Sequence, residues 1–356
     1  MKIKLGKKTI GIDEKPYFIA DIGANHDGNL ERAYKLIELA KEAGADAAKF
    51  QNFQAPQIVS KTGFDSLHGQ LSHQKSWKKS VYEIYEDASL SFDWTSKLKE
   101  KCDSVGIEYF TSPYDFQSVD LVDEYVEVFK IGSGDITWLD IIRYIAKKGK
   151  PILLATGASN LEDVKRAMDI LLEQTNDIVL MQCNTNYTGS EQNFNFINLN
   201  VLNEYKKIYP ETVLGLSDHT PGYSTVLGAY ALGARVFEKH FTDDILREGP
   251  DHKFAMNPRA WKDMVNACDQ LQRAMGDGVK RIEDNEKETM YVQRRALRYA
   301  LNLEKGHIIN KNDVFPLRPY SVEGLHPYEI NKIVGKELKV SVKSDELVKL
   351  EDFSND

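Results

Sequence analysis

Eight short apolar runs, separated by segments with helical spacing, constrain the fold of this chain more than any other feature. The runs are rich in β-branched and aromatic residues and occupy 17–24, 47–53, 107–111, 128–133, 151–156, 178–184, 213–218 and 234–240. Between them, apolar residues recur every three to four positions, as in 30–43 and 161–173. Strands that alternate with helices imply right-handed crossovers and a parallel sheet, and eight such units imply closure. The sequence therefore predicts an α/β fold, a (β/α)8 TIM barrel.

The sequence pattern changes after the eighth strand–helix unit. A helical run ends at Gly276-Asp277-Gly278, and a charged stretch follows. From residue 294 onward, short runs separated by turn signals are typical of a small β-rich domain. We predict a barrel domain over 1–278, a linker over 279–293 and a small domain over 294–356. A domain of that size is marginally stable alone, so we expect it to dock on a barrel or on another subunit.

The connection after the second run is longer than the others. Residues 61–91 hold His68, His73, Trp77, Tyr82 and Tyr85 among lysines and glutamates. A long connection at this end of a barrel strand is a candidate cover for an active site. An ordinary surface loop with a short helix is the alternative.

Composition excludes several classes of protein. The 356 residues include 46 basic and 54 acidic ones, and a net charge of -8 argues against general nucleic-acid binding. The longest apolar stretches fall far short of the roughly 20 residues needed to cross a bilayer, so we expect no membrane partner. The first residues carry lysines with no apolar core behind them, unlike a signal peptide. Three widely spaced cysteines, Cys102, Cys183 and Cys268, fit a reducing cytoplasm, where we expect the protein.

Polar residues stand at the carboxyl ends of the expected strands, which form the active face of such a barrel. They are Asp21, Asn25, His26, Lys49, Gln51, Thr111, Lys130, Ser133, Thr156, Asn184, Tyr187, Ser217, His219, Glu238 and His240. A buried charge is costly unless it is paired, so Lys49 and Lys130 need anionic partners. With Thr111, Ser133 and Ser217 as hydrogen-bond donors, the lysines predict a pocket for a phosphate or a carboxylate.

His219 and His240 end the last two strands and are expected side by side at the rim. Two neutral imidazoles with open remaining positions suit a divalent transition metal that also binds substrate or water. Two hydrogen-bonded barrel histidines without a metal are the alternative. Glu238 lies two residues before His240, so strand alternation directs it to the same face.

Ordered motifs along the chain carry a resemblance to a known family. They are IADIGANHDG (19–28), GADAAKFQ (44–51), FTSP (110–113), FKIGSGD (129–135), ATG (155–157), GLSDHT (215–220), FEKHFT (237–242), GPDH (249–252), LRP (317–319) and GLHP (324–327). They resemble the motifs of the sialic acid synthase family, and the last two resemble its C-terminal antifreeze-like (SAF) domain. The resemblance covers nearly the whole chain.

The resemblance implies an activity. That family condenses phosphoenolpyruvate with an N-acetylated hexosamine and releases phosphate, forming a nine-carbon 2-keto acid. It implies a carbon–carbon bond-forming transferase of the N-acetylneuraminate synthase type, with N-acetylmannosamine as the expected acceptor. A diacetamido-trideoxyhexose of the legionaminic type is the alternative acceptor. Mn²⁺ is the expected metal, with Mg²⁺ or Co²⁺ as alternatives.

The resemblance also implies roles for individual residues. Lys49, Lys130, Ser133, Asn184 and Ser217 are expected to hold phosphoenolpyruvate, together with Thr111; Gln51, Tyr187 and Asp251 to face the sugar; and His219 and His240 to bind the metal. Glu238, Asp21 and His240 are the candidate catalytic residues. Arg318 matches the arginine of the family's small domain, and we expect it to reach the sugar site of a neighbouring subunit in a domain-swapped homodimer.

Four departures from the family pattern concern the site. Asp21 stands where a glutamate is usual, and Ala155 stands where a serine is common. Asn184 and Asn186 flank the position of the family's strand-six asparagine. The long connection at 61–91 shows no clear equivalent of the family's substrate-binding asparagine. The departures leave the reaction class intact and leave the acceptor sugar open.

Two rival functions use the same residues differently. A Schiff-base aldolase with Lys49 or Lys130 as nucleophile predicts activity without a metal. A non-catalytic carbohydrate-binding or scaffold protein gives no reason to bury a set of ionisable residues.

Overall fold

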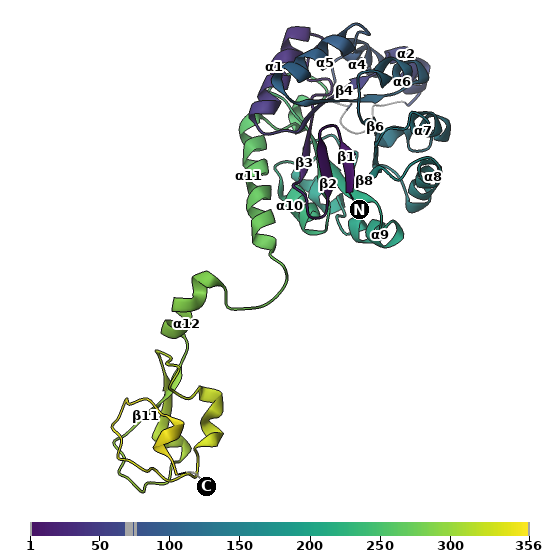
Figure 1. Cartoon of the computed structure of the whole chain (residues 1–356). Coiled ribbons are helices and arrows are strands. Elements are labelled where there is room, and N and C mark those ends of the chain that lie inside the picture. Colours follow the sequence, from purple (N-terminus) through teal and green to yellow (C-terminus); the bar gives the residue numbers. More distant parts are fainter. Residues whose placement is uncertain (1, 68–73, 75–76, 355–356) are drawn as a thin grey trace. The chain divides into compact units, whose positions relative to one another are not determined.

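The computed structural model describes residues 2–67, 74 and 77–354. Eight parallel strands close into a barrel in the order β10-β3-β4-β5-β6-β7-β8-β9 (Figure 1). They are β3 (Tyr17–Asp21), β4 (Ala47–Asn52), β5 (Glu108–Pro113), β6 (Phe129–Ile131), β7 (Ile152–Ala155), β8 (Ile178–Cys183), β9 (Val213–Asp218) and β10 (Val236–His240). Seven of the eight expected runs hold one of these strands, and the run 107–111 overlaps β5, which extends two residues further, so the predicted TIM barrel is confirmed.

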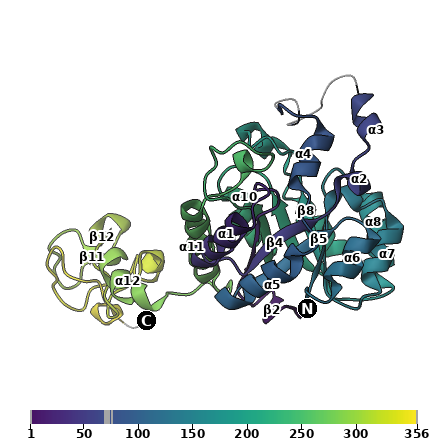
Figure 2. The ribbon, with the colours of Figure 1, turned by 90° about the horizontal axis from the view of Figure 1, so that it is seen from above.

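Most helices surround the strands on the outside of the barrel, whereas those of the long connection after β4 lie beyond one end of it (Figures 1 and 2). Together these helices are α1 (Leu30–Glu42), α2 (Ala55–Ile58), α3 (Lys61–Asp65), α4 (Val81–Ala88), α5 (Trp94–Val105), α6 (Phe116–Asp123), α7 (Leu139–Ala146), α8 (Leu161–Leu172), α9 (Val201–Ile208), α10 (Ser224–Ala231) and α11 (Pro258–Met275). Asn29 and Asn160 cap α1 and α8 with side-chain oxygens that accept backbone N–H groups. Such caps fix where each crossover turns back along the sheet.

An N-terminal hairpin, which the sequence analysis did not predict, closes one end of the barrel. Strand β1 (Lys2–Leu5) pairs with β2 (Lys8–Gly11) in antiparallel register. Ile3, Leu5 and Ile10 of the hairpin are buried in one cluster with inward residues such as Tyr17 and Val236. Because Tyr17 and Val236 begin their strands, the hairpin covers the amino ends. The opposite, carboxyl ends are left for the site.

The chain divides into two compact units, Met1–Gly276 and Asp277–Asp356. The second contains α12 (Lys287–Gln293) and a two-stranded antiparallel sheet of β11 (Ala296–Tyr299) and β12 (Val314–Leu317). Its core is a separate apolar cluster that includes Leu297, Tyr299 and Ile333. The segment predicted as a linker is thus helical at its end, over α12. None of the described helices is long and apolar enough to cross a membrane.

Candidate active site

A cavity of about 390 Å³ opens at the carboxyl ends of the barrel strands. Most of the predicted site residues line it: Asp21, Lys49, Gln51, Lys130, Ser133, Tyr187, Ser217, His219, Glu238, His240 and Asp251. They come from five strands and from the loops that follow them. The barrel therefore brings together side chains that are far apart in the sequence.

Two buried lysines and two buried carboxylates form the floor of this cavity. Lys49 Nζ donates to Asp21 Oδ2 at 2.6 Å and lies 3.9 Å from Glu238 Oε1. Lys130 Nζ donates to the same Glu238 oxygen at 2.9 Å, and the Ser217 hydroxyl donates to it at 3.1 Å. The four ionisable side chains are at most 5% exposed. The anionic partners that the lysines require are thus supplied by the protein itself.

The cluster fixes the charge of its members. Burial would lower the pKa of Lys49, but the carboxylates of Asp21 and Glu238 outweigh it and raise that pKa. Burial would raise the pKa of Glu238, but the two lysines lower it to about 2. Asp21 differs, because its burial raises its pKa against the opposing effect of Lys49. Lys49 therefore acts as a fixed positive charge.

Polar atoms in this cavity are left for a ligand. Among the described residues, Asp21 Oδ1, Glu238 Oε2 and His240 Nδ1 are buried and have no hydrogen-bond partner. Buried polar atoms are nearly always satisfied, so each of these atoms needs a partner that the protein does not supply. The residues that carry these atoms all line the cavity.

The two histidines lie side by side, with ring centroids 5.4 Å apart. Burial lowers the pKa of His219 to about 3 and that of His240 to about 4, so both rings are neutral at pH 7. His219 Nδ1–H donates to the Asn184 carbonyl at 2.9 Å, which leaves the lone pair of Nε2 free. The described residues contain no group of three or more His, Cys, Asp or Glu side chains that could hold a metal. Two neutral imidazoles with free lone pairs nevertheless fit a metal whose other ligands are substrate and water.

Asp251 lies close to His240, and Gln51 lies close to Asp21. Asp251 Oδ2 lies 3.6 Å from His240 Nδ1 and accepts the backbone N–H of Ala24 at 3.1 Å. Gln51 Nε2 donates to Asp21 Oδ2 at 3.3 Å. The Tyr187 ring packs on His219 with centroids 4.4 Å apart. Gln51, Tyr187 and Asp251 all line the cavity.

Two predicted anion ligands do not line the cavity. Strand alternation points Phe110 and Ser112 inward, so Thr111 faces the helices and its hydroxyl donates to Asn52 Oδ1 at 2.6 Å. The prediction for Thr111 was one residue out of register. The Asn184 side chain bonds to the Phe196 carbonyl and the Asn186 N–H, and only its backbone reaches the site, through His219.

Arg318 lies in the second compact unit. Its side chain is exposed, and Nε donates to the Gln293 carbonyl at 2.8 Å. Its expected contact with the sugar of another subunit stays a prediction.

The long connection supplies cavity residues that the sequence analysis did not assign. Trp77, Ile84 and Tyr85 line the cavity together with Tyr114 and Asp135. The expectation of a cover over the site was the only sequence signal for the first three. His68 and His73, in the same connection, lie outside the described residues.

Fold and site together define a (β/α)8 barrel with a cavity, lined by ionisable side chains, at the carboxyl ends of its strands. The model of the NeuB family matches residues 36–280, and that of the SAF domain matches residues 294–354. The chain belongs to the NeuB family, with a C-terminal SAF domain, and the predicted resemblance is confirmed.

Relatives with different products are similar to the chain. It is 34% identical to the N,N'-diacetyllegionaminic acid synthase of Campylobacter jejuni, over 94% of this chain and 99% of the relative. The pseudaminic acid synthase of the same species is 32% identical over 96% of this chain and 97% of the relative. The structure of N-acetylneuraminic acid synthetase from Leptospira borgpetersenii, in complex with citrate, superimposes with a TM-score of 0.70 at 26% identity, covering 82% of this chain and 95% of that one.

Proposed function

We propose that the chain condenses phosphoenolpyruvate with an N-acetylated hexosamine, releasing phosphate and forming a nine-carbon 2-keto sugar acid. The observation that carries this proposal is the pair of buried lysines, Lys49 and Lys130, on the floor of a cavity with unsatisfied polar atoms. Phosphoenolpyruvate carries a carboxylate and a phosphate on one carbon, and Lys49 and Lys130, although each bonds to one carboxylate of the protein, keep further N–H donors for these groups. Membership of a family of nonulosonic acid synthases supports the same reaction.

The acceptor that we propose is N-acetylmannosamine. The alternative is a diacetamido-trideoxyhexose, favoured by the 34% identity to a diacetyllegionaminic acid synthase. Gln51, Tyr187 and Asp251 would face this sugar at the cavity mouth, while Lys49, Lys130, Ser133 and Ser217 would hold phosphoenolpyruvate below it. Carbon 3 of phosphoenolpyruvate and the aldehyde carbon of the sugar, the two atoms to be bonded, would then lie next to each other.

The proposed reaction proceeds in three steps. Carbon 3 of phosphoenolpyruvate attacks the sugar aldehyde, whose oxygen takes up a proton, and a cation remains at carbon 2. Water adds to carbon 2 and loses a proton. The tetrahedral intermediate expels phosphate by carbon–oxygen cleavage, which leaves the ketone.

The cluster at the cavity floor serves these steps electrostatically. Lys49 and Lys130 offset the charge of the phosphate and the carboxylate throughout, since preorganised charges need no rearrangement during reaction. Glu238, held ionised beside Lys130, faces the region where the cation forms and can orient the water. Asp21, whose pKa is raised, is placed between Lys49 and His240 and can exchange a proton with the sugar.

We propose Mn²⁺ as the metal, with Mg²⁺ or Co²⁺ as alternatives, held by His219 and His240. Such an ion polarises a carbonyl as a Lewis acid. The protein contributes two neutral imidazoles, and the Asn184 carbonyl fixes the orientation of one of them.

The three buried free thiols, Cys102, Cys183 and Cys268, support a cytoplasmic location for the reaction.

We also propose that the enzyme is a domain-swapped homodimer in which Arg318 contacts the sugar in the other subunit's barrel. The test mixes Arg318→Ala subunits with Lys49→Ala subunits. A mixed dimer then has one site with both lesions and one with neither, so activity should partly return. Absence of recovery despite demonstrated subunit exchange contradicts the swap, as does full activity of a monomer.

The Schiff-base alternative requires a neutral lysine. The raised pKa of Lys49 and the bonds of both lysines to carboxylates disfavour it. Borohydride in the presence of pyruvate fixes an imine if one forms, and we expect no covalent adduct.

Phosphate release from phosphoenolpyruvate tests the proposed function. We expect release only when an N-acetylated amino sugar is present, and more of it with Mn²⁺ than after chelation. A panel of N-acetylmannosamine, its 6-phosphate and diacetamido-trideoxyhexoses identifies the acceptor. Failure of every acceptor, with and without metal, contradicts the proposal.

A further inference from the structure

The loop between β10 and α11 forms a wall of the substrate cavity. We name residues 243–254 the rim loop. Its base is closed, because Thr242 N donates to the Met256 carbonyl at 3.0 Å and Met256 N donates to the His240 carbonyl at 2.8 Å. Asp251 in this loop lines the substrate cavity, and Arg247 lines a second cavity of about 820 Å³ beside it. The position of the rim loop therefore sets the position of Asp251, the side chain that we propose to contact the sugar.

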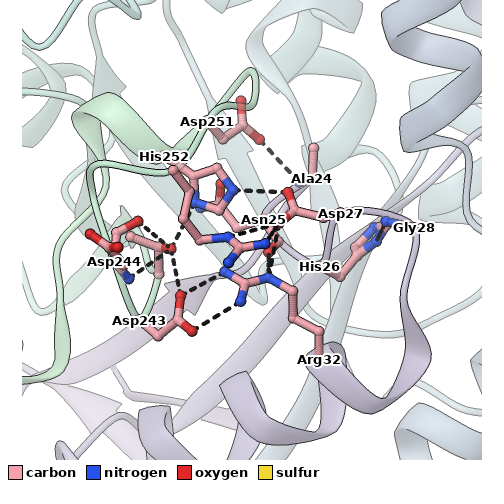
Figure 3. Close-up of polar contacts among 12 residues, drawn as sticks. Ala24, Asn25, His26, Asp27, Gly28, Arg32, Asp243, Asp244, Asp251 and His252 are labelled. Atoms are coloured by element: carbon pink, nitrogen blue, oxygen red, sulfur yellow. Dashed lines mark hydrogen bonds and ion pairs between the residues drawn. The ribbon is translucent and has the colours of Figure 1, made fainter.

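A buried histidine anchors the rim loop at the residue after Asp251. The His252 side chain is 0% exposed, and both ring nitrogens have partners. Nε2–H donates to Asp27 Oδ1 at 2.9 Å, and Nδ1 shares a hydrogen bond of 2.8 Å with the Thr242 hydroxyl (Figure 3). Thr242 belongs to the base of the loop, whereas Asp27 belongs to the turn between β3 and α1. His252 therefore ties the loop both to its own base and to a distant segment.

The second oxygen of Asp27 binds two arginines. Arg247 of the rim loop donates to Oδ2 through Nε at 3.0 Å and Nη2 at 2.8 Å. Arg32 of α1 approaches the same oxygen to 3.1 Å and makes a bidentate pair with Asp243, at 2.9 and 2.6 Å. Burial would raise the pKa of Asp27, but the bonds from His252 and Arg247 lower it. A single carboxylate thus joins the loop to the turn at two points.

The backbone on both sides is shaped for this approach. Asp27 has a φ of 51°, a left-handed conformation that aspartate and asparagine tolerate better than most residues. A Cβ at Gly249 would lie 2.6 Å from the His252 ring, and a Cβ at Gly23 would lie 2.7 Å from Asp251 Oδ2. Two glycines therefore make room for His252 and Asp251 in the positions that they occupy.

We propose that Asp27 and His252 form a latch that fixes the rim loop on the β3–α1 turn and so positions Asp251 toward the acceptor sugar. The inference rests on the proposed function, because it assumes that Asp251 faces the sugar. Asp27 and His252 are positioning residues, since they act through Asp251. Lys49 on β4 bonds to Asp21, and Lys130 on β6 bonds to Glu238; neither bond involves Asp27 or His252. The latch should therefore affect the sugar and spare phosphoenolpyruvate.

The test compares the Michaelis constants of the two substrates in Asp27→Gly. Glycine adopts a φ of 51° without strain and removes the side chain together with its carboxylate. We expect KM for the sugar to rise about tenfold, while KM for phosphoenolpyruvate changes by less than about twofold. Asp27→Asn should partly restore the sugar KM, because its amide oxygen still accepts from His252 and asparagine tolerates the backbone.

Asp243→Asn is the matched control. Asp243 pairs with Arg32 across the same junction, but at the far end of the rim loop from Asp251. We expect this variant to keep a sugar KM within about twofold of the wild type. An equal rise of both KM values in Asp27→Gly, or no rise of either, overturns the latch. If Asp27→Gly does not fold, His252→Gln replaces it, with the same expected and contradicting outcomes.

A second measurement separates the latch from the proposed function. If the wild type releases no phosphate with any sugar, the proposed function fails, whatever the variants do. Hydrogen exchange then decides on the latch alone. We expect faster exchange in residues 243–254 in Asp27→Gly, and exchange of these residues equal to that of the wild type overturns the latch.

Discussion

Replacing Lys239 by methionine should destabilise the barrel strongly, although Lys239 lies outside the cavity. Lys239 on β10 pairs with Asp218 on β9, directly beside it in register, and the two side chains are each 1% exposed. Lys239 Nζ also donates to the Thr220 carbonyl at 2.8 Å. Asp218 and Lys239 immediately precede the two histidines of the site, so this pair joins the strands that carry them.

The size of the effect follows from burial. Removing one partner of a buried ion pair costs about 3–5 kcal/mol, because the other charge is left uncompensated. Asp218 keeps two hydroxyl donors, from Thr220 and Thr225, so we expect the lower end, about 3 kcal/mol. For a unit of 276 residues, whose unfolding entropy is about 0.6 kcal/mol/K, that corresponds to a fall in Tm of roughly 5 °C.

Urea and thermal unfolding, followed by circular dichroism, measure this effect. The double variant Asp218→Asn, Lys239→Met should regain about half of the loss, because no charge is left buried. Lys207→Met is the control: its pair with Glu204 is exposed, and its removal should cost less than about 1 kcal/mol. The reasoning is refuted if Lys239→Met costs no more than Lys207→Met, or if the double variant is no more stable than the single one.

Three further predictions concern the cavity. Burial raises the pKa of Asp135 to about 6, above its unfolded value, so the wild type loses stability as pH rises from about 4 to 6. Urea titrations should therefore find Asp135→Asn more stable than the wild type by about 1–3 kcal/mol at pH 7.5, and equally stable below pH 4. His219→Ala or His240→Ala should remove Mn²⁺ binding, measured by calorimetry, together with activity, while Tm changes little; full activity in metal-free buffer contradicts the metal assignment. Asp21→Glu should change the ranking of acceptor sugars in the phosphate-release assay more than KM for phosphoenolpyruvate, and an unchanged ranking assigns Asp21 elsewhere.

The barrel could be predicted from sequence because each strand is bounded by its own turn and helix signals. The same signals do not set which residue of a strand faces inward. Thr111 was therefore placed in the cavity, although Ser112 lies there. The hairpin β1–β2 was missed because its strands, KIKL and KTIG, contain lysines and lack the continuous apolar run that marks the equally short β7, ILLA.

The site was predictable where a side chain sits on a strand, and less so where loops meet. Lys49 and Lys130 were assigned from inward positions on strands, and both line the cavity. Asn184 follows the last residue of β8, and its side chain bonds to the Phe196 carbonyl instead of lining the cavity. Arg247 and Asp27 are separated by 220 positions, and no local pattern indicates that they meet. Such contacts depend on the tertiary path of two loops.

Phosphoenolpyruvate labelled with oxygen-18 at its bridging oxygen tests the central claim most directly. The chain is incubated with this substrate, Mn²⁺ and the acceptor sugar, and phosphate and sugar acid are analysed by mass spectrometry. Attack by carbon 3 followed by carbon–oxygen cleavage predicts that the label leaves with the phosphate, one phosphate for each sugar consumed. Label retained in the keto acid or in pyruvate, or phosphate released without a sugar product, contradicts the account.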